Sequence, residues 1–239
     1  MSALRLSPGR RSVEAAPGQN MAGPAISVDG VTKVYGPRGS HTFALDRISL
    51  NVQPGEFCCL VGASGCGKST LLNLLAGLDT PAAGSISVQG RTSLMFQESA
   101  LFPWLSVRGN INLALRLAGV PKAERKDRAS DLLRMVRLKG MGGKRPHELS
   151  GGMRQRVALA RALAQNASVL LMDEPFGALD AITRDLLHDE IERVWQETGI
   201  TVVFVTHNVR EGVRLEVHHY FRYGGMELVL NDGPGICSD

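Results

Sequence analysis

The sequence predicts an α/β fold built on a mainly parallel β-sheet that helices cover on both faces. Short runs rich in β-branched residues alternate with amphipathic segments along the chain. Two of these runs, Val169–Met172 and Thr201–Val205, are almost entirely apolar, as is typical of parallel strands buried on both faces. A length of 239 residues, 44% of them hydrophobic, suits one sizeable α/β domain or two small ones.

The first expected strands follow an N-terminal segment without periodicity. Residues 1–22 are rich in Pro, Gly, Ala and Arg, and we expect a disordered leader there, with both Met1 and Met21 open as the start. Strands bounded by Gly and Pro turns are predicted at Ile26–Val34, Phe43–Val52 and Phe57–Val61.

The next elements are a helix and two short strands. The segment Lys68–Ala76 predicts a helix, because Gly77 is a good left-handed residue to follow its last turn. Ser85–Val88 and Thr92–Phe96 predict strands around a turn at Gly90.

Residues from about 98 to 150 show no strand pattern and predict a helical insertion. Ser106 is a candidate N-cap for a helix that ends near Ala118, and a charged helix is expected over Lys122–Val136. Beyond the insertion, further helices are predicted from Ser150 to about Ala164 and over Ala181–Glu197.

Composition excludes several classes of protein. The 27 Lys and Arg exceed the 23 Asp and Glu by only four and form no basic stripe, so we expect no nucleic-acid partner. The chain contains no run of 18 apolar residues that predicts a membrane span. Its four Cys show neither zinc-site spacing nor a disulfide framework.

A glycine-rich segment between a predicted strand and a predicted helix fits the phosphate-loop pattern GxxxxGK[ST]. Glycines allow successive backbone N–H groups to face a phosphate, Lys68 would reach the β- and γ-phosphates, and the Ser69 hydroxyl would bind Mg²⁺. The alternative is a Gly-rich turn without a ligand. The predicted nucleotide-binding residues are Gly62, Ala63, Ser64, Gly65, Cys66, Gly67, Lys68, Ser69 and Thr70.

Two carboxylates follow the predicted strand Val169–Met172. Asp173 suits the Mg²⁺ shell, and Glu174 suits polarising the attacking water. The alternative is a strand that happens to end in acidic residues, but the phosphate loop upstream favours the catalytic interpretation.

The segment Leu149–Arg156 (LSGGMRQR) predicts a second anion site, with Ser150 as N-cap, Gly152 in the first turn and a helix N-terminus behind them. A nucleotide bound at the phosphate loop does not need a second anion site from the same chain. We therefore expect the second anion site to bind a nucleotide that another subunit holds. This segment resembles the signature motif of the ATP-binding cassette (ABC) ATPases.

Other ABC motifs occur in the expected order, and the resemblance covers about residues 26–215. It implies that Tyr35 stacks on adenine, that Gln97 senses Mg²⁺ and the attacking water, that Asp180 belongs to the D-loop, and that His207 senses the γ-phosphate. Taken one at a time, each could instead be an ordinary surface or strand-end residue.

The resemblance implies a P-loop NTPase cassette over residues 23–215, with a RecA-like, mostly parallel core, an antiparallel β subdomain and a helical subdomain at about 98–150. It also implies ATP and Mg²⁺ as cofactors and two ATPase subunits, most simply identical copies, with Ser150 and Gly152 acting on the partner's nucleotide. The implied catalytic residues are Glu174, His207, Gln97 and Lys68, and the implied Mg²⁺ ligands are Ser69, Gln97 and Asp173.

The sequence around Phe102, Pro103 and Trp104 is most similar to that of importers of the nitrate, sulfonate and taurine type. The resemblance implies a peripheral subunit at the cytoplasmic face of the cell membrane that binds transmembrane permease subunits. An extracytoplasmic solute-binding protein is implied as an indirect partner. Exposed Phe102 and Trp104 beside Pro103 would suit an apolar docking site for a helix of the permease. The alternative for Trp104 is burial in the helical subdomain. The alternative function is that of a soluble ABC ATPase acting on nucleic acid or ribosomes, and a catalytically inactive scaffold is a third interpretation.

The resemblance fades in the tail, residues 216–239. Gly224 and Gly225 separate two apolar runs, which predicts either a β-hairpin that replaces the usual closing strands or an altered tail that packs poorly.

Overall fold

The computed structural model describes residues 23–36, 42–208, 210–211, 219–223 and 226–231, so the predicted leader 1–22 lies outside the described residues. The described strands are β1 (Ile26–Tyr35), β2 (Thr42–Val52), β3 (Phe57–Gly62), β4 (Ala83–Val88), β5 (Thr92–Met95), β6 (Val169–Asp173), β7 (Thr201–Thr206), β8 (His219–Tyr223) and β9 (Met226–Asn231). The described α-helices are α1 (Lys68–Leu75), α2 (Val107–Leu117), α3 (Arg125–Met135), α4 (Gly151–Leu163) and α5 (Ala181–Thr198), and short 3-10 turns at Met141–Gly143 and Pro146–Glu148 precede α4.

The larger sheet has the order β5-β6-β7-β3-β9-β8, and its first four strands are parallel. The mainly parallel sheet expected from the sequence is therefore confirmed. Of the two alternatives for the tail, the structure has the hairpin: β8 and β9 pair antiparallel, and β9 lies antiparallel to β3 from Phe57↔Asn231 to Gly62↔Met226. The tail thus extends the sheet beyond β3.

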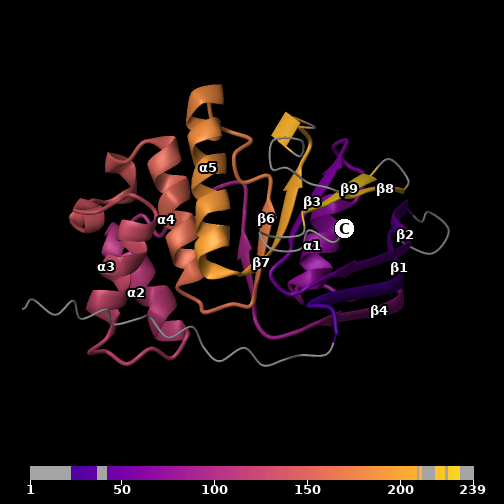
Figure 1. The fold of residues 1–239 in the computed structure, drawn as a ribbon, viewed down its shortest axis with the longest axis horizontal. Coiled ribbons are helices and arrows are strands. Elements are labelled where there is room, and N and C mark those ends of the chain that lie inside the picture. The colour runs from indigo at the N-terminus through magenta and orange to yellow at the C-terminus, as the bar shows by residue number, and fades with distance from the viewer. Residues whose placement is uncertain (1–22, 37–41, 209, 212–218, 224–225, 232–239) are drawn as a thin grey trace, which may run out of the picture.

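Alternate residues of the parallel strands face opposite sides of this sheet. In β3, Phe57, Cys59 and Val61 pack into one apolar cluster with residues of α2, α3, α4 and α5. Cys58 and Leu60 pack into a second cluster with α1 and the antiparallel strands. Figure 1 shows this layering, with α4 and α5 on one side of the sheet and α1 on the other. Burial on both faces explains why these strands are apolar throughout.

The smaller sheet is antiparallel, with the order β2-β1-β4. The two short strands predicted around Gly90 separate here, because β4 pairs with β1 whereas β5 pairs with β6 in the larger sheet. Gly90 has φ 82°, and a Cβ atom there would lie 2.4 Å from Ser168 Oγ. The turn at Gly90 therefore passes the chain from one sheet to the other.

The chain between β5 and β6 is helical, as predicted. Ser106 caps α2 by accepting a hydrogen bond from Gly109 N at 3.1 Å. The helix expected over Lys122–Val136 begins only at Arg125, because the chain first forms a turn in which Glu124 N donates to Pro121 O. In the part of the chain that the structure describes, no helix has the length and apolar character needed to cross a bilayer.

Candidate active site

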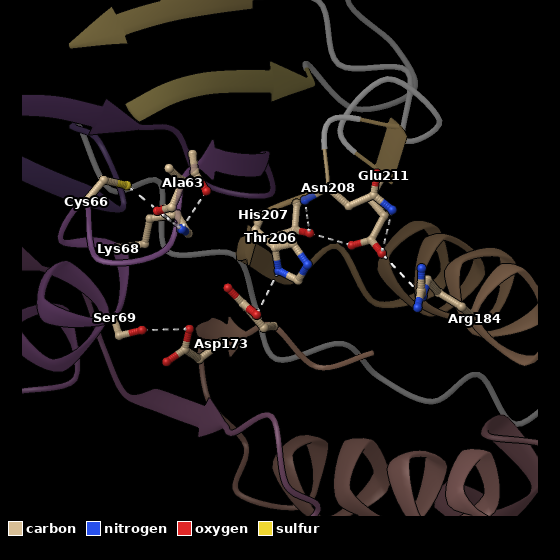
Figure 2. Close-up of polar contacts among 12 residues, drawn as sticks. Ala63, Cys66, Lys68, Ser69, Asp173, Arg184, Thr206, His207, Asn208 and Glu211 are labelled. Carbon is tan, nitrogen blue, oxygen red and sulfur yellow. Dashed lines mark hydrogen bonds and ion pairs between the residues drawn. The ribbon is translucent and has the colours of Figure 1, made fainter. Parts of the chain in front are cut away.

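The predicted catalytic residues lie at one edge of the larger sheet. The phosphate loop follows β3, Asp173 ends β6, and His207 follows β7. Because these strands are parallel, their carboxyl ends meet at the same edge, where α/β proteins generally bind ligands. Figure 2 shows the side chains of this edge together.

The phosphate loop folds around the ammonium group of Lys68. Lys68 is 4% exposed, and its Nζ donates hydrogen bonds to the carbonyl oxygens of Gly62 at 2.7 Å and Ala63 at 2.9 Å. Gly67, the N-cap of α1, provides no side-chain cap to the first turn. The N–H groups that begin α1 thus remain available to an anion, which is the arrangement that phosphate binding requires.

Two oxygen ligands suited to Mg²⁺ lie beside this loop. Ser69 Oγ donates a hydrogen bond to Asp173 Oδ1 at 3.1 Å. Burial raises the pKa of the Asp173 carboxyl, and the hydrogen bond from Ser69 opposes that rise. A half-buried carboxylate beside a hydroxyl fits a hard divalent cation, because both provide oxygen ligands and the cation relieves the cost of burying the negative charge.

Glu174 and His207 form a contact pair next to these ligands. Glu174 Oε2 lies 2.9 Å from His207 Nδ1. Glu174 has φ 44°, which is unfavourable for a residue with a side chain, and its backbone N donates to Val205 O at 2.9 Å. Strain of this kind costs about 1–3 kcal/mol and persists only where the surroundings enforce it. The sheet edge therefore holds Glu174 in place.

Gln97 approaches the same turn from β5. A Cβ atom on Gly177 would lie 3.0 Å from Gln97 Nε2, so the amide of Gln97 packs against the turn that follows Glu174. The backbone oxygen of Gln97 accepts a hydrogen bond from Gln155 Nε2 of α4 at 2.6 Å. Gln97 is thus linked both to the catalytic edge and to the helical segment.

The ring of Tyr35 is fixed at the end of β1. Its hydroxyl donates to Asp79 Oδ2 at 3.0 Å, and Lys33 Nζ lies 5.1 Å from the ring centroid. Hydrogen bonding, first of all from Lys33, lowers the pKa of the Asp79 carboxyl. Tyr35 remains 45% exposed, which leaves ring surface for a planar base.

The remaining predicted residues are not brought to the phosphate loop. Ser150 caps α4 by accepting a hydrogen bond from Met153 N at 3.3 Å, and Asp180 caps α5 through Thr183 N at 2.9 Å. This bond lowers the pKa of Asp180. Gly152 packs against α5, since a Cβ atom there would lie 2.5 Å from Thr183 Cγ2. The start of α4 lies on the opposite side of the sheet from α1 (Figure 1).

Sequence reasoning missed a polar cluster behind His207. Thr206 Oγ1 donates to Glu211 Oε2 at 2.6 Å, and Arg184 Nε lies 3.5 Å from Glu211 Oε1. Glu211 is only 7% exposed. Glutamate is normally a surface residue, so its position alone gave no signal of burial.

An aromatic pair with one exposed ring lies between β5 and α2. Trp104 is 68% exposed, and its ring centroid lies 5.5 Å from that of Phe102. The alternative in which Trp104 is buried among the helices is therefore wrong.

Comparison with known proteins identifies the family of the chain. Residues 45–177 match the family described as ABC transporter. The chain is 44% identical over 219 residues to the nitrate import ATP-binding protein NrtD of Synechocystis sp., a match that covers 88% of this chain and 79% of the relative. It is 45% identical over 220 residues to the taurine import ATP-binding protein TauB of Chromobacterium violaceum, covering 88% and 80%.

A solved structure is similar over most of its length. The post-hydrolysis dimer of the ATP-binding cassette MJ0796, bound to ADP and Pi, aligns with a TM-score of 0.68 and 33% identity, covering 78% of this chain and 89% of that one.

Proposed function

The chain belongs to the ABC transporter family and is an ATPase, and from that premise we propose that it drives the import of a small anion of the nitrate, sulfonate or taurine type. The observation that carries the proposed catalysis is one edge of the sheet, where Lys68, the Ser69–Asp173 pair and the Glu174–His207 pair meet. The names of the nitrate and taurine relatives support the substrate class.

Each group at this edge has a distinct proposed task. Lys68 and the N–H groups at the start of α1 hold the β- and γ-phosphates of ATP. Ser69 and Asp173, with Gln97 as a further ligand, would hold Mg²⁺, which would supply positive charge to balance the phosphates. Glu174 accepts a proton from the attacking water. His207, whose Nδ1 lies 2.9 Å from Glu174 Oε2, contacts the γ-phosphate.

A second copy of the chain completes the proposed site. Ser150 and Gly152 form an anion-binding helix start that lies across the sheet from the phosphate loop of the same chain. A nucleotide bound to one copy and capped by Ser150 of the other binds the closed dimer better than the open one, which lets ATP drive closure. The dimeric cassette among the similar structures supports this arrangement.

The pair formed by exposed Trp104 and half-buried Phe102 is the proposed docking point for a membrane permease. Exposed aromatic residues are enriched at binding hot spots, and the pair follows Gln97, so a docked permease helix lies a few residues from a proposed Mg²⁺ ligand. We place the subunit at the cytoplasmic face of the membrane, with a solute-binding protein acting on the permease from the other side.

Hydrolysis by the Glu174→Gln variant tests the proposed base. Glutamine preserves the size of the side chain but accepts no proton, so kcat should fall by roughly 10²–10⁴-fold while the affinity for ATP stays within about twofold. Steady-state hydrolysis and nucleotide binding in the presence of Mg²⁺ measure the two quantities. Hydrolysis at the parental rate would refute the assignment of Glu174.

The transport role needs a separate experiment. The chain should co-purify from detergent-extracted membranes with the permease of an anion importer, and Trp104→Ala should lower both recovery and transport while hydrolysis by the free subunit is unchanged. Leu78→Ala, which also alters an exposed apolar side chain (65% exposed), is the matched control. Co-sedimentation with ribosomes in the absence of a permease would favour the soluble ABC ATPase instead.

A further inference from the structure

A buried carboxylate lies directly behind the proposed catalytic pair. Glu211 Oε2 accepts the hydroxyl hydrogen of Thr206 at 2.6 Å, and Thr206 Oγ1 in turn accepts from Asn208 N at 3.0 Å. Glu211 N donates to Asn208 O at 3.0 Å. Glu211 thus forms hydrogen bonds with Thr206 and Asn208, the residues immediately before and after His207.

Asn208 Nδ2 also donates to Glu211 Oε1 at 3.5 Å, and further contacts of Glu211 come from α5. Arg184 Nε lies 3.5 Å from Glu211 Oε1, as an ion pair rather than an aligned hydrogen bond, and His188 Nε2 lies 3.9 Å from Oε2. Arg184 Nη2 also donates to Leu179 O at 2.8 Å. Arg184 therefore connects Glu211 to the residues that lead into α5, as Figure 2 shows in part.

A small cavity lies between residues of this cluster and the catalytic pair. Its volume is about 20 Å³, enough for one water molecule, and its lining includes Glu174, His207, Arg184 and Glu211. The Glu174–His207 pair and the Glu211–Arg184 ion pair thus line the same cavity, so a displacement of Glu211 changes the support of His207 directly.

We propose that Glu211 and Arg184 are positioning residues that hold His207 against Glu174 and tie that placement to the start of α5. The ion pair acts through His207, without contact with substrate, and the inference rests on the proposed roles of Glu174 and His207. A buried carboxylate without its cationic partner is strongly unfavourable. Loss of Arg184 thus frees Glu211 to move, and His207 moves with it.

Hydrolysis by three variants tests the proposal in the full-length chain. Glu211→Gln and Arg184→Gln should each lower kcat about tenfold, because misplacement of a catalytic group by less than 1 Å is costly, while KM for ATP stays within about twofold. The double variant should be no slower than either single variant, because both remove the same ion pair. Glu197→Gln, which removes an exposed ion pair with Arg193 on the same helix, is the matched control and should be unaffected.

Thermal unfolding of each variant separates positioning from a general loss of structure. If Glu211→Gln does not fold, the more exposed Arg184→Gln carries the test. A KM that rises with the loss of kcat, or a double variant slowed by the product of the two single effects, would overturn the inference. His207→Ala and Glu174→Gln are assayed alongside. Hydrolysis at the parental rate in these two variants would refute the proposed function. Hydrolysis at the parental rate only in the Glu211 and Arg184 variants would refute this inference alone.

Discussion

The backbone of the phosphate loop leaves no room for a side chain at Gly67, and Gly67→Ala should destabilise the protein measurably. A Cβ atom there would lie 2.3 Å from the carbonyl oxygen of Ala44 and 2.8 Å from Leu45 Cδ2. The Leu45 methyl can rotate away, but the Ala44 carbonyl belongs to β2 and moves only with that strand. The carbonyl would have to retreat about 0.7 Å to reach the 3.0 Å closest approach of real Cβ atoms.

Gly65 provides a matched control for this substitution. Both glycines lie in the same loop at positive φ, 83° for Gly65 and 100° for Gly67, but a Cβ atom on Gly65 would meet nothing within 4 Å. Gly65→Ala therefore carries only the backbone strain of about 1–2 kcal/mol. Gly67→Ala adds overpacking of about 1–3 kcal/mol against β2. The difference between the two variants measures the clash of the added carbon with β2, at Ala44 and Leu45 together.

Urea unfolding of the nucleotide-free protein measures both losses. We expect the free energy of unfolding to fall by about 2–5 kcal/mol for Gly67→Ala, against a total of about 5–15 kcal/mol for a typical domain. Because the clash displaces the start of α1, ATP affinity should fall as well. Leu45→Ala should not rescue Gly67→Ala, since the carbonyl clash remains. Equal losses of stability in the two glycine variants would refute the reasoning.

Two further predictions follow from the charged groups. Burial raises the pKa of the Asp173 carboxyl, so the folded state binds the carboxyl proton more tightly than the unfolded state does. The stability that this proton contributes is present below the unfolded-state pKa and is lost as pH rises through the folded-state pKa. Asp173→Asn should therefore have a higher melting temperature than the parent at pH 7, and the difference in melting temperature should disappear at acidic pH. The variant should also lose Mg²⁺-dependent hydrolysis. A difference in melting temperature that stays constant with pH would contradict the role given to burial. Glu190 is fully buried between Arg137 and Arg193, so Arg193→Ala should cost about 3 kcal/mol in urea unfolding. Arg134→Ala, which breaks an exposed pair with Asp131, should cost less than about 1 kcal/mol, and equal costs would show that burial of Glu190 does not matter.

Local chemistry made much of the fold predictable from the sequence. Ser106 and Ser150 were identified as caps because a short hydroxyl side chain satisfies N–H groups that every helix start leaves free, and both caps are present. Gly199 ends α5 with φ 63°, a conformation that glycine adopts without strain. The parallel strands were predictable because burial on both faces makes them apolar at every position.

Pairing between distant segments was not predictable in the same way. Nothing in the residues around Gly90 says that β4 and β5 join different sheets, because each strand finds its partner far along the chain. The burial of Glu211 depends on Arg184, which lies on another element. The candidate site was therefore predictable where a motif concentrates its chemistry within a few residues, and not where it depends on side chains that meet only after folding.

Contacts between α4 and α5 connect the two ends of the proposed site within one chain. Gly152 packs so closely against Thr183 that a single added carbon would lie 2.5 Å from the Thr183 methyl. The first turn of α4 therefore cannot approach α5 any further. One helical position beyond Thr183, Arg184 forms the ion pair with Glu211, whose neighbours hold His207. A force applied at Ser150 by a nucleotide on a partner subunit would thus act on α5 through direct packing, and on His207 through the Arg184–Glu211 pair. The proposed capture of ATP at Ser150 and the placement of His207 would then be two ends of one series of contacts.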